Sequence, residues 1–259
     1  MFASLERKGF EIKCVSHAAA ILEKDFREAV NELESALLSV SIPITEIIGS
    51  GGGEAKGTQR LRRSLHAQKW QKHHFEIRKI INGVERESTS HEVDHVRLFP
   101  DGDVIALEIE WNNKDPFFDR DLENFKRLHA EGAMSLGVII TRGSSLQDRM
   151  YDLVYRFTEE RRLISYADLE NLGLDPTKRQ KAAVMKRVER TRNPVPFGQA
   201  WSEHFVSDKF GAATTHWRKL MDRVDRGVGN PCPLLLIGIP ASVVTFEPND
   251  RIDPLPETD

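Results

Sequence analysis

The segment HEVDHVRLFPDGDVIALEIEWNN, residues 91–113, decides the fold prediction because it places a tight turn between two strand-forming runs. Pro100-Asp101-Gly102 is a three-residue loop with glycine last, where a left-handed backbone is required, and Phe99 is expected to face Asp103 across it. The flanking runs VDHVRLF and VIALEIEW are rich in β-branched and apolar residues. The segment is therefore predicted to form an antiparallel β-hairpin.

Four acidic side chains are expected to share one face of this hairpin. The predicted register sets Asp94 opposite Glu108 and Glu92 opposite Glu110, and side chains two residues apart on a strand point to the same face. Like charges directly across a strand pair repel each other. Such a cluster therefore indicates either a polar face that is open to water or a bound cation.

The cation interpretation predicts a metal site, because hard cations prefer oxygen ligands. Asp94, Glu108 and the backbone carbonyl of Ile109 are the candidate ligands for Mg²⁺. Glu110 stands beside them as a general base or as a ligand of a second metal ion. The alternative is the ordinary solvated face of a hairpin.

Residues 91–95 also match the H-E-x-x-H signature of zinc metalloproteases. That signature binds zinc on a helix, where His at i and i+4 share a face. Here His91 and His95 fall in a run of strand formers, a turn follows directly, and no downstream helix offers an obvious third ligand. A protease is therefore the least favoured interpretation.

The composition describes an ordinary globular chain. Its 259 residues are 39% hydrophobic and 30% charged, which suits one large domain or a core with a small appendage. Cys14 and Cys232 form no disulfide or zinc pattern, no stretch is long enough to span a membrane, and the N-terminus lacks a signal-peptide core. A cytoplasmic location is expected. The net charge of −3 gives no overall case for nucleic-acid binding, which must rest on local patches.

Several other segments have clear patterns. Ser16–Val40 has the period of one amphipathic helix, and Asn82-Gly83 predicts a second hairpin that makes the first part of a meander. Helices are predicted over 121–131 and 146–160, a buried strand over 135–141, and one or two strands within 234–246, interrupted at Pro240. The fold class predicted is α/β (α+β), with a central mixed β-sheet that contains an antiparallel meander and is flanked by helices.

Two basic stretches are candidate DNA contacts. The glycine-rich residues 49–53 lead into a segment that carries Arg60, Arg62, Arg63, Lys69 and Lys72, and no P-loop pattern follows the glycines. Lys178–Arg192 is basic apart from Glu189. A flexible linker and a solvated helix face are the alternatives to contacts with the DNA backbone.

The strings DHV at 94–96, EIEWNNKDPFFDRDL at 108–122 and SLGVIITRG at 135–143 carry a resemblance. They are similar to the BglII/BstYI group of type II restriction endonucleases, which belongs to the PD-(D/E)xK nuclease superfamily. The resemblance is specific over roughly residues 45–145 and holds only in layout elsewhere. It implies a restriction-endonuclease-like fold and Mg²⁺-dependent cleavage of double-stranded DNA that leaves 5′-phosphate ends.

The resemblance implies that Asp94 and Glu108 bind Mg²⁺ and that Glu110 takes the third position. The common superfamily member has Lys at that position, whereas BamHI-like relatives also place Glu there. The role of Glu110 as base, second-metal ligand or water-positioning residue stays open, as does the number of metal ions. Glu76, with His73 or His74 behind it, is a weak candidate for an upstream polar residue near the metal.

The resemblance also implies DNA contacts and a partner copy. Lys114 could stabilise phosphate charge, although a surface lysine is the alternative, and Asn112 and Asn113 could reach bases or backbone or simply cap the strand. The candidate DNA-binding residues are Asn112, Asn113, Arg60, Arg62, Arg142, Lys186, Arg190 and Arg192.

Reading a short palindrome, GATC-centred in this group, implies a homodimer. One nuclease domain over residues 1–259 is expected, with a helical and Gly-rich DNA-contacting part at 1–72, a catalytic core at 73–166 and a recognition and dimer part at 167–259. A cognate DNA methyltransferase would accompany such an enzyme. A DNA-binding module with an inactive nuclease site is the main alternative.

Overall fold

The computed structural model describes residues 1–49 and 54–246, and a six-stranded mixed sheet forms its centre. The strand order is β1-β7-β6-β5-β4-β3. The strands are β1 Glu11–Val15, β7 Leu234–Ile239, β6 Leu136–Arg142, β5 Val104–Glu110, β4 Val84–Leu98 and β3 Gln71–Ile81. The β3-β4-β5 part is an antiparallel meander, β5-β6-β7 is parallel, and β1 closes the other edge antiparallel to β7. The predicted fold class is confirmed.

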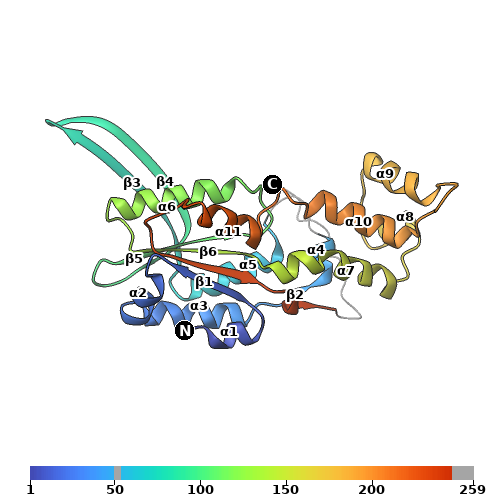
Figure 1. The fold of residues 1–259 in the computed structure, drawn as a ribbon, viewed down its shortest axis with the longest axis horizontal. Coiled ribbons are helices and arrows are strands. Elements are labelled where there is room, and N and C mark those ends of the chain that lie inside the picture. The colour runs from blue at the N-terminus through green and yellow to red at the C-terminus, as the bar shows by residue number, and fades with distance from the viewer. Residues whose placement is uncertain (50–53, 247–259) are drawn as a thin grey trace.

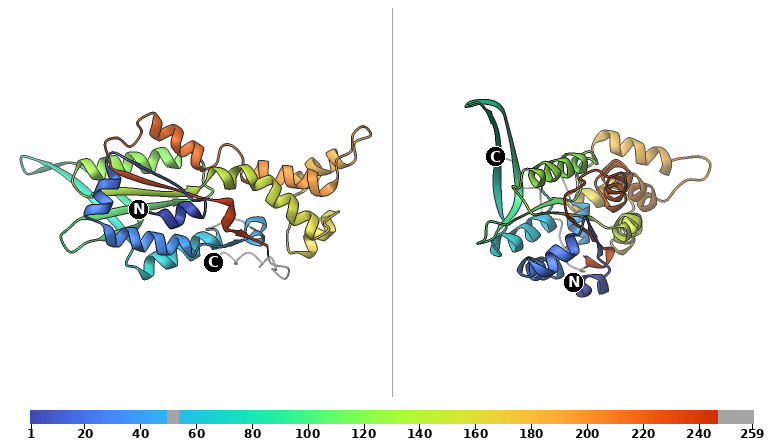
Figure 2. Two further views of the ribbon diagram at one scale, coloured as in Figure 1. Left: turned by 60° about the horizontal axis from the view of Figure 1, so that its bottom comes forward. Right: turned by 60° about the vertical axis from the view of Figure 1, so that its left-hand side comes forward.

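Helices cover both faces of the sheet (Figures 1 and 2). One face packs against α1 Ala3–Arg7, α2 Ala18–Lys24, α3 Arg27–Leu38 and α5 Lys56–Ala67, and the other against α6 Phe117–Ala130 and α11 Trp217–Asp225. Each face has its own hydrophobic cluster. The parallel strands β6 and β7 are buried along their whole length, as expected where helices cover both faces.

The remaining helices lie at one end of the molecule, opposite the β3-β4 hairpin (Figure 1). They are α4 Ile44–Ile48, α7 Ser144–Glu160, α8 Tyr166–Asn171, α9 Lys178–Val188 and α10 Phe197–Lys209. After β7 come a short 3-10 helix at Ala241–Val243 and β8 Val244–Thr245, which pairs with β2 Ile42–Pro43. None of the helices in the described ranges is both long and apolar enough to pass through a lipid bilayer.

Both predicted turns are present, and each depends on a glycine with positive φ. Gly102 has φ 92°, and the Phe99 amide donates to the Asp103 carbonyl at 2.9 Å, as the predicted register requires. Asn82 and Gly83, with φ 53° and 76°, connect β3 to β4. These are the conformations that a two-residue hairpin loop of this sequence favours.

The prediction of one helix over Ser16–Val40 is wrong, because the chain breaks between α2 and α3. Phe26 stands at the break with non-helical angles, φ −124° and ψ 39°. Its ring is buried and lies 4.9 Å from the ring of Phe99 in the hairpin loop. This tertiary contact overrides the helical period. Most of the glycine run at 49–53 lies outside the described residues.

Candidate active site

A β-bulge in β4 sets the position of Asp94. The β3-β4 register runs from Gln71↔Val96 to His73↔Val93, so Lys72 alone stands opposite both Asp94 and His95. A bulge inserts an extra residue, bends the strand and re-aims its side chains. Strands β4 and β5 pair in the predicted register, but the last pair is His95↔Leu107. The next pair of that register would be Asp94 and Glu108, and it does not form. Asp94 is thereby left at an opening of the sheet, with 61% of its side chain exposed.

The acids of β5 are buried, in contrast to Asp94. Glu108 is 5% exposed and Glu110 is 3% exposed, and their spacing of two residues places both on the face that α6 covers. Burial, with Asp121, Asp94 and Glu110 adding negative charge, raises the pKa of Glu108 to about 9. Burial and Asp121 raise the pKa of Glu110 to about 8. Two carboxyl groups with such pKa values suit a site where a proton or a cation is held.

A further acid, Asp121 of α6, belongs to this group and was not predicted as a site residue. It is fully buried, and its Oδ2 accepts no hydrogen bond from any donor of the described chain. Its Oδ1 accepts a bond of 2.8 Å from Nε of Arg120, whose Nη2 also lies 3.6 Å from Oε1 of Glu110. A sequence signal existed, because Asp121 falls among the core-facing positions Phe118 and Leu122 of the helix.

Glu92, predicted to complete the set of four, does not join the buried acids. It is 53% exposed and pairs with Lys72 at 2.6 Å, a contact that lowers its pKa. Lys72 Nζ also lies 3.9 Å from Asp94. The bulge is the physical reason, because it breaks the alternation of side chains between Glu92 and Asp94.

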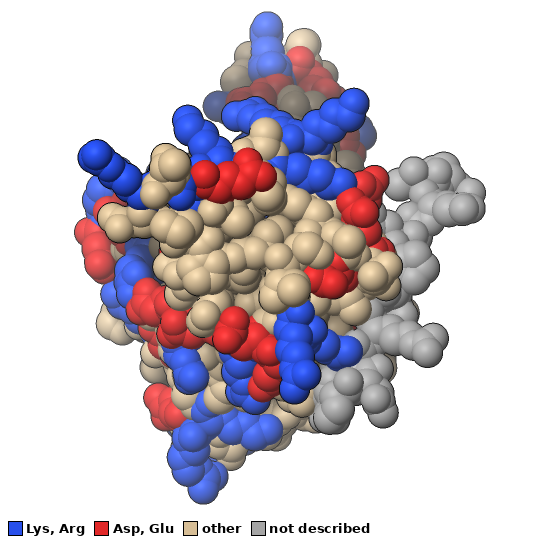
Figure 3. Space-filling model, turned by 90° about the vertical axis from the view of Figure 1, so that its right-hand side faces the viewer, with Lys and Arg blue, Asp and Glu red and all other residues tan. Residues whose placement is uncertain are grey.

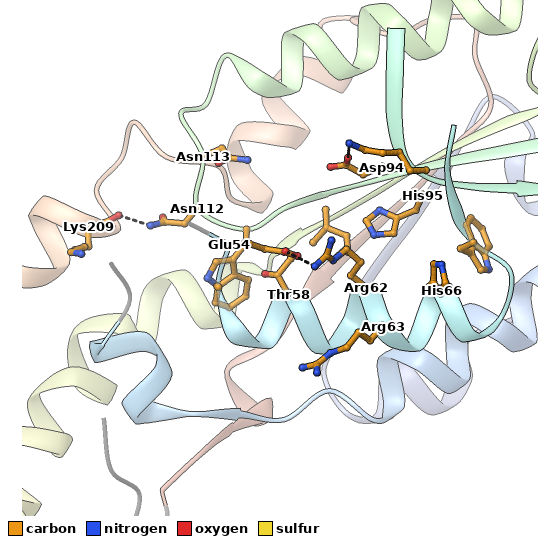
Figure 4. Close-up of a pocket in the computed structure, with 15 residues that line it drawn as sticks. Glu54, Thr58, Arg62, Arg63, His66, Asp94, His95, Asn112, Asn113 and Lys209 are labelled. Atoms are coloured by element: carbon orange, nitrogen blue, oxygen red, sulfur yellow. Dashed lines mark hydrogen bonds and ion pairs between the residues drawn. The ribbon is translucent and has the colours of Figure 1, made fainter. Parts of the chain in front are cut away.

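A cleft of about 900 Å³ opens beside Asp94 (Figure 4). Helix α5 forms one wall with Thr58, Arg62, Arg63 and His66. Asp94, His95, Ile109, Trp111, Asn112, Asn113 and Lys209 also line the cleft. Asp94 and Ile109 thus share the cleft with basic side chains of α5, of which Arg62 also pairs with Glu54 at 3.2 Å. The buried acids Glu108 and Glu110 do not line the cleft themselves.

The residues after β5 are held by internal contacts. Nδ2 of Asn112 donates to the Lys209 carbonyl at 3.0 Å, and Nδ2 of Asn113 donates to Oε2 of Glu110 at 2.7 Å. Lys114 forms a backbone bridge to Thr214 and is exposed. The two asparagines therefore lie in the cleft, and Asn113 orients a candidate catalytic carboxylate.

Arg142 was predicted to contact DNA, and this prediction is wrong. It is completely buried at the end of β6, and burial lowers its pKa to about 9. Its guanidinium donates to the carbonyls of Trp111 and Thr215, both at 2.8 Å, and to the side chains of Gln147 and Thr214, both at 2.7 Å. Arg142 therefore ties the 111–115 segment to the 214–215 segment and has no path to a base.

The other candidates lie outside the cleft. Arg60 pairs with Glu46 at 2.5 Å and donates to the Ser41 carbonyl, and Glu76 pairs with Arg78 on the exposed hairpin. The His73 ring packs against the ring of Phe75, and His74 stands opposite Glu92 in the register of β3 and β4. The residues toward the far end are Lys186 in α9 and, just after it, Arg190 and Arg192, all exposed. Figure 3 faces that end and shows Lys and Arg around an uncharged centre rather than one continuous basic surface.

The H-E-x-x-H match lies within strand β4, so the zinc protease interpretation is wrong. His91 faces Asn124, whose Nδ2 lies 3.1 Å from its ring nitrogens, whereas His95 is buried. On a strand the two histidines lack the helical spacing that zinc requires.

The fit to a divalent cation rests on the chemistry of the donors. Among residues 1–49 and 54–246, no three His, Cys, Asp or Glu side chains stand close enough together to hold a metal ion unaided. Asp94, Glu108 and the Ile109 carbonyl nevertheless offer only oxygen atoms, and Oδ2 of Asp121, which lies near enough to raise the pKa of Glu108, is buried without a donor. Oxygen-rich sites of this kind suit Mg²⁺, which is commonly bound through one or two carboxylates with its remaining positions filled by water and phosphate oxygen.

A mixed sheet between two layers of helices, with acids on adjacent strands, is consistent with the class of proteins that have a restriction-endonuclease-like fold. The family model described as restriction endonuclease BglII/BglIII matches residues 10–239. The chain therefore belongs to the BglII/BglIII restriction endonuclease family, which confirms the predicted resemblance. No curated protein matches the chain. Membership implies a type II restriction endonuclease, that is, a site-specific nuclease that binds DNA.

Proposed function

We propose that the protein is a Mg²⁺-dependent type II restriction endonuclease that cuts both strands of a short palindrome and leaves 5′-phosphate ends. The observation that carries this proposal is the position of Asp94, which the bulge places at the mouth of a basic cleft beside the buried acids of β5. A phosphodiester in the cleft could meet oxygen ligands from the sheet and cations from α5 at the same time.

Asp94, Glu108 and the carbonyl of Ile109 would hold Mg²⁺. The bound cation would polarise the scissile phosphate and favour attack by water. Burial and, after it, the neighbouring carboxylates raise the pKa of Glu108, and the charge of a bound cation would offset both effects.

Glu110 is the proposed general base. A base works best when its pKa lies near the working pH, and that of Glu110 is about 8. Its Oε2 is oriented by Asn113 at 2.7 Å. The attacking water gives its proton to Glu110, its oxygen bonds to phosphorus, and the bond from phosphorus to the 3′-oxygen breaks as that oxygen gains a proton from solvent.

The cleft is the proposed DNA path. Arg62 and Arg63 would neutralise phosphates from the α5 side, which supplies affinity without sequence specificity, and His66 lies on the same wall. Asn112 and Asn113 lie where base edges or backbone near the cut could be reached, and Lys114 is exposed next to them. Lys186, Arg190 and Arg192 stay proposed backbone contacts on a separate surface.

A homodimer is proposed, because a palindrome presents the same cut site twice, related by a two-fold axis. The division into parts at 1–72, 73–166 and 167–259, a cytoplasmic location and a partner methyltransferase belong to the same proposal.

Digestion of a long unmethylated duplex DNA tests the proposal, with Mg²⁺ or with EDTA, and with Asp94→Ala as the matched variant. Discrete fragments that need Mg²⁺ and are lost in Asp94→Ala are expected, and sequencing their ends gives the site. Asp94 is exposed, so its replacement should leave the fold intact. Folded, dimeric protein that leaves DNA uncut in Mg²⁺ and in Mn²⁺ would replace this proposal by a binding module.

A further inference from the structure

Arg120, in the first turn of α6, is the cation in closest contact with the buried acids. Its Nε and Nη2 both lie 2.8 Å from Oδ1 of Asp121, and Nη2 lies 3.6 Å from Oε1 of Glu110. Glu108 is also near enough for Arg120 to lower its pKa. One guanidinium therefore interacts with three acids of the candidate site.

The side chain of Arg120 is held in place and yet open to solvent. Its guanidinium stacks over the ring of Phe117, with Cζ 4.4 Å from the ring centre. It is 49% exposed, whereas Asp121 and Glu110 are buried. Among the described residues Nη1 donates no hydrogen bond, and arginine carries more N–H donors than the bonds to Asp121 use. Arg120 is thus a preoriented guanidinium that is half exposed and has N–H donors left for a ligand beside the acids.

Other nearby cations are less suited to act on a phosphate at this point. Lys72 lines the cleft, but its Nζ is already paired with Glu92 at 2.6 Å and lies 3.9 Å from Asp94. Lys114 follows β5, but its contacts to Thr214 and Phe117 are made by the backbone, and within the described residues none of them orients its exposed ammonium group. Strand β5 itself carries acidic side chains but no Lys, Arg or His. A phosphate brought against these acids adds negative charge, and a fixed guanidinium is well suited to bind its oxygens.

We propose that Arg120 is a catalytic residue that donates hydrogen bonds from its guanidinium to a non-bridging oxygen of the scissile phosphate. This inference rests on the nuclease function proposed above. Charge grows on the phosphate oxygens as the water oxygen bonds to phosphorus and the bond to the 3′-oxygen breaks. Arg120 stabilises that charge and stays protonated throughout, so the proton of the water goes to Glu110 as before.

The alternative role for Arg120 is structural, as a counter-ion that only allows Asp121 to be buried. The two roles separate in a set of variants: Arg120→Gln, Arg120→Lys, Asp121→Asn and the double variant Arg120→Gln/Asp121→Asn. The double variant removes the buried charge of Asp121 together with its counter-ion Arg120. It can therefore still fold, and the role of Arg120 can still be tested, if Arg120→Gln alone does not fold. Lys126→Gln is the matched control, since Lys126 lies on the same helix, is 44% exposed and pairs with Glu123.

The experiment measures the single-turnover cleavage rate in Mg²⁺ on a duplex that carries the site, together with DNA affinity without metal. Loss of one preoriented donor to a developing oxyanion typically slows a reaction by about a hundredfold or more. That loss is expected in Arg120→Gln and in the double variant, with affinity changed by less than about tenfold, so that the reaction rate rather than binding is affected. Arg120→Lys should retain more activity than Arg120→Gln, and Lys126→Gln should cleave like the wild type.

Two results would overturn the catalytic role of Arg120 and leave the proposed nuclease function standing. One is an Arg120→Gln variant that cleaves within about threefold of the wild-type rate, against the loss expected for such a donor. The other is recovery of the wild-type rate in the double variant, which would make Arg120 a structural counter-ion. Failure of the wild-type protein to cleave any DNA would instead overturn the nuclease function, and this proposal with it.

Discussion

The side-chain amide of Asn113 donates a 2.7 Å hydrogen bond to Oε2 of Glu110. Asn113 follows the strand that carries Glu110. Its backbone N–H donates a hydrogen bond to Oγ1 of Thr215 at 3.1 Å. The 214–215 segment, fixed by Arg142, therefore sets the position of Asn113 and, through it, the carboxylate of Glu110.

Asn113→Ala is expected to move the pH dependence of cleavage. The hydrogen bond lowers the pKa of Glu110 against the effect of burial, so its loss raises that pKa further. Hydrogen bonds to charged groups contribute about 1.5–3 kcal/mol, equivalent to a shift of about one unit or more. The midpoint of the pH–rate profile should therefore rise by about one unit. Asn112→Ala, which removes a bond to a carbonyl only, should leave that midpoint in place, and an unmoved midpoint in Asn113→Ala would separate Asn113 from Glu110.

The metal-free protein is expected to lose stability as pH rises above neutrality. Glu108 and Glu110 have folded-state pKa values of about 9 and about 8, so the folded state binds more protons than the unfolded state between the ordinary carboxyl range and these values. Stability then falls as pH rises. His95 and His216, with pKa lowered by burial to about 4, act in the opposite direction only below their ordinary value.

Thermal unfolding in EDTA at pH values between about 7 and 8.5 checks this linkage. The unfolding temperature should drop across that range, and Mg²⁺ should restore it most at the high end, because the cation binds the ionised carboxylates. Glu108→Gln should show a shallower pH dependence and a weaker Mg²⁺ effect. A flat profile in EDTA would contradict the raised carboxyl pKa values.

Arg142→Met is expected to destabilise the fold rather than to alter DNA recognition. It breaks four hydrogen bonds at 2.7–2.8 Å and leaves two carbonyl groups without a donor. Buried polar groups left unsatisfied cost about 1–3 kcal/mol each, so the free energy of unfolding should fall by about 3 kcal/mol or more. Urea denaturation measures this loss, with the exposed Arg192→Met as control. A loss below about 1 kcal/mol would mean that the buried network is not needed.

Arg62→Gln is expected to weaken DNA binding in a way that depends on salt. A residue that neutralises one phosphate contributes about 0.9 to the slope of log affinity against log salt concentration in duplex DNA. Arg62 lies in the cleft, so its loss should reduce the slope by about that amount. Arg190→Gln, at the far end of the molecule, should change the slope less. Equal slopes for wild type and Arg62→Gln would place the DNA elsewhere.

The sequence predicted those features that depend on a few neighbouring residues. Gly102 and the Asn82-Gly83 pair specify two turns and hence the antiparallel meander, and the apolar run of β6 specifies a buried strand. The identity of the acids on β5 followed from the register of the Pro100–Gly102 turn. Local chemistry therefore sufficed for the meander and the adjacent buried strand, whereas the edge strand β1 was not predicted.

Other features depend on contacts between distant segments and could not be read locally. The bulge at Asp94 arises in the pairing with β3, the helix break at Phe26 arises from packing on Phe99, and the burial of Arg142 depends on the 214–215 segment. A basic side chain at a strand end looks the same in sequence whether it faces DNA or the core. Asp121 could have been predicted from the sequence, because it is an acidic residue among the apolar, core-facing positions of α6.

The most direct test of the central claim is Mg²⁺-dependent cleavage of duplex DNA by wild type and by Glu108→Gln. Burial already favours the uncharged form of Glu108, so a neutral side chain of the same shape should fold normally and bind DNA, while it removes the proposed metal-binding charge. The account predicts site-specific cleavage by the wild type and a loss of at least about a thousandfold in the folded variant. Cleavage by Glu108→Gln at a rate near that of the wild type would contradict it.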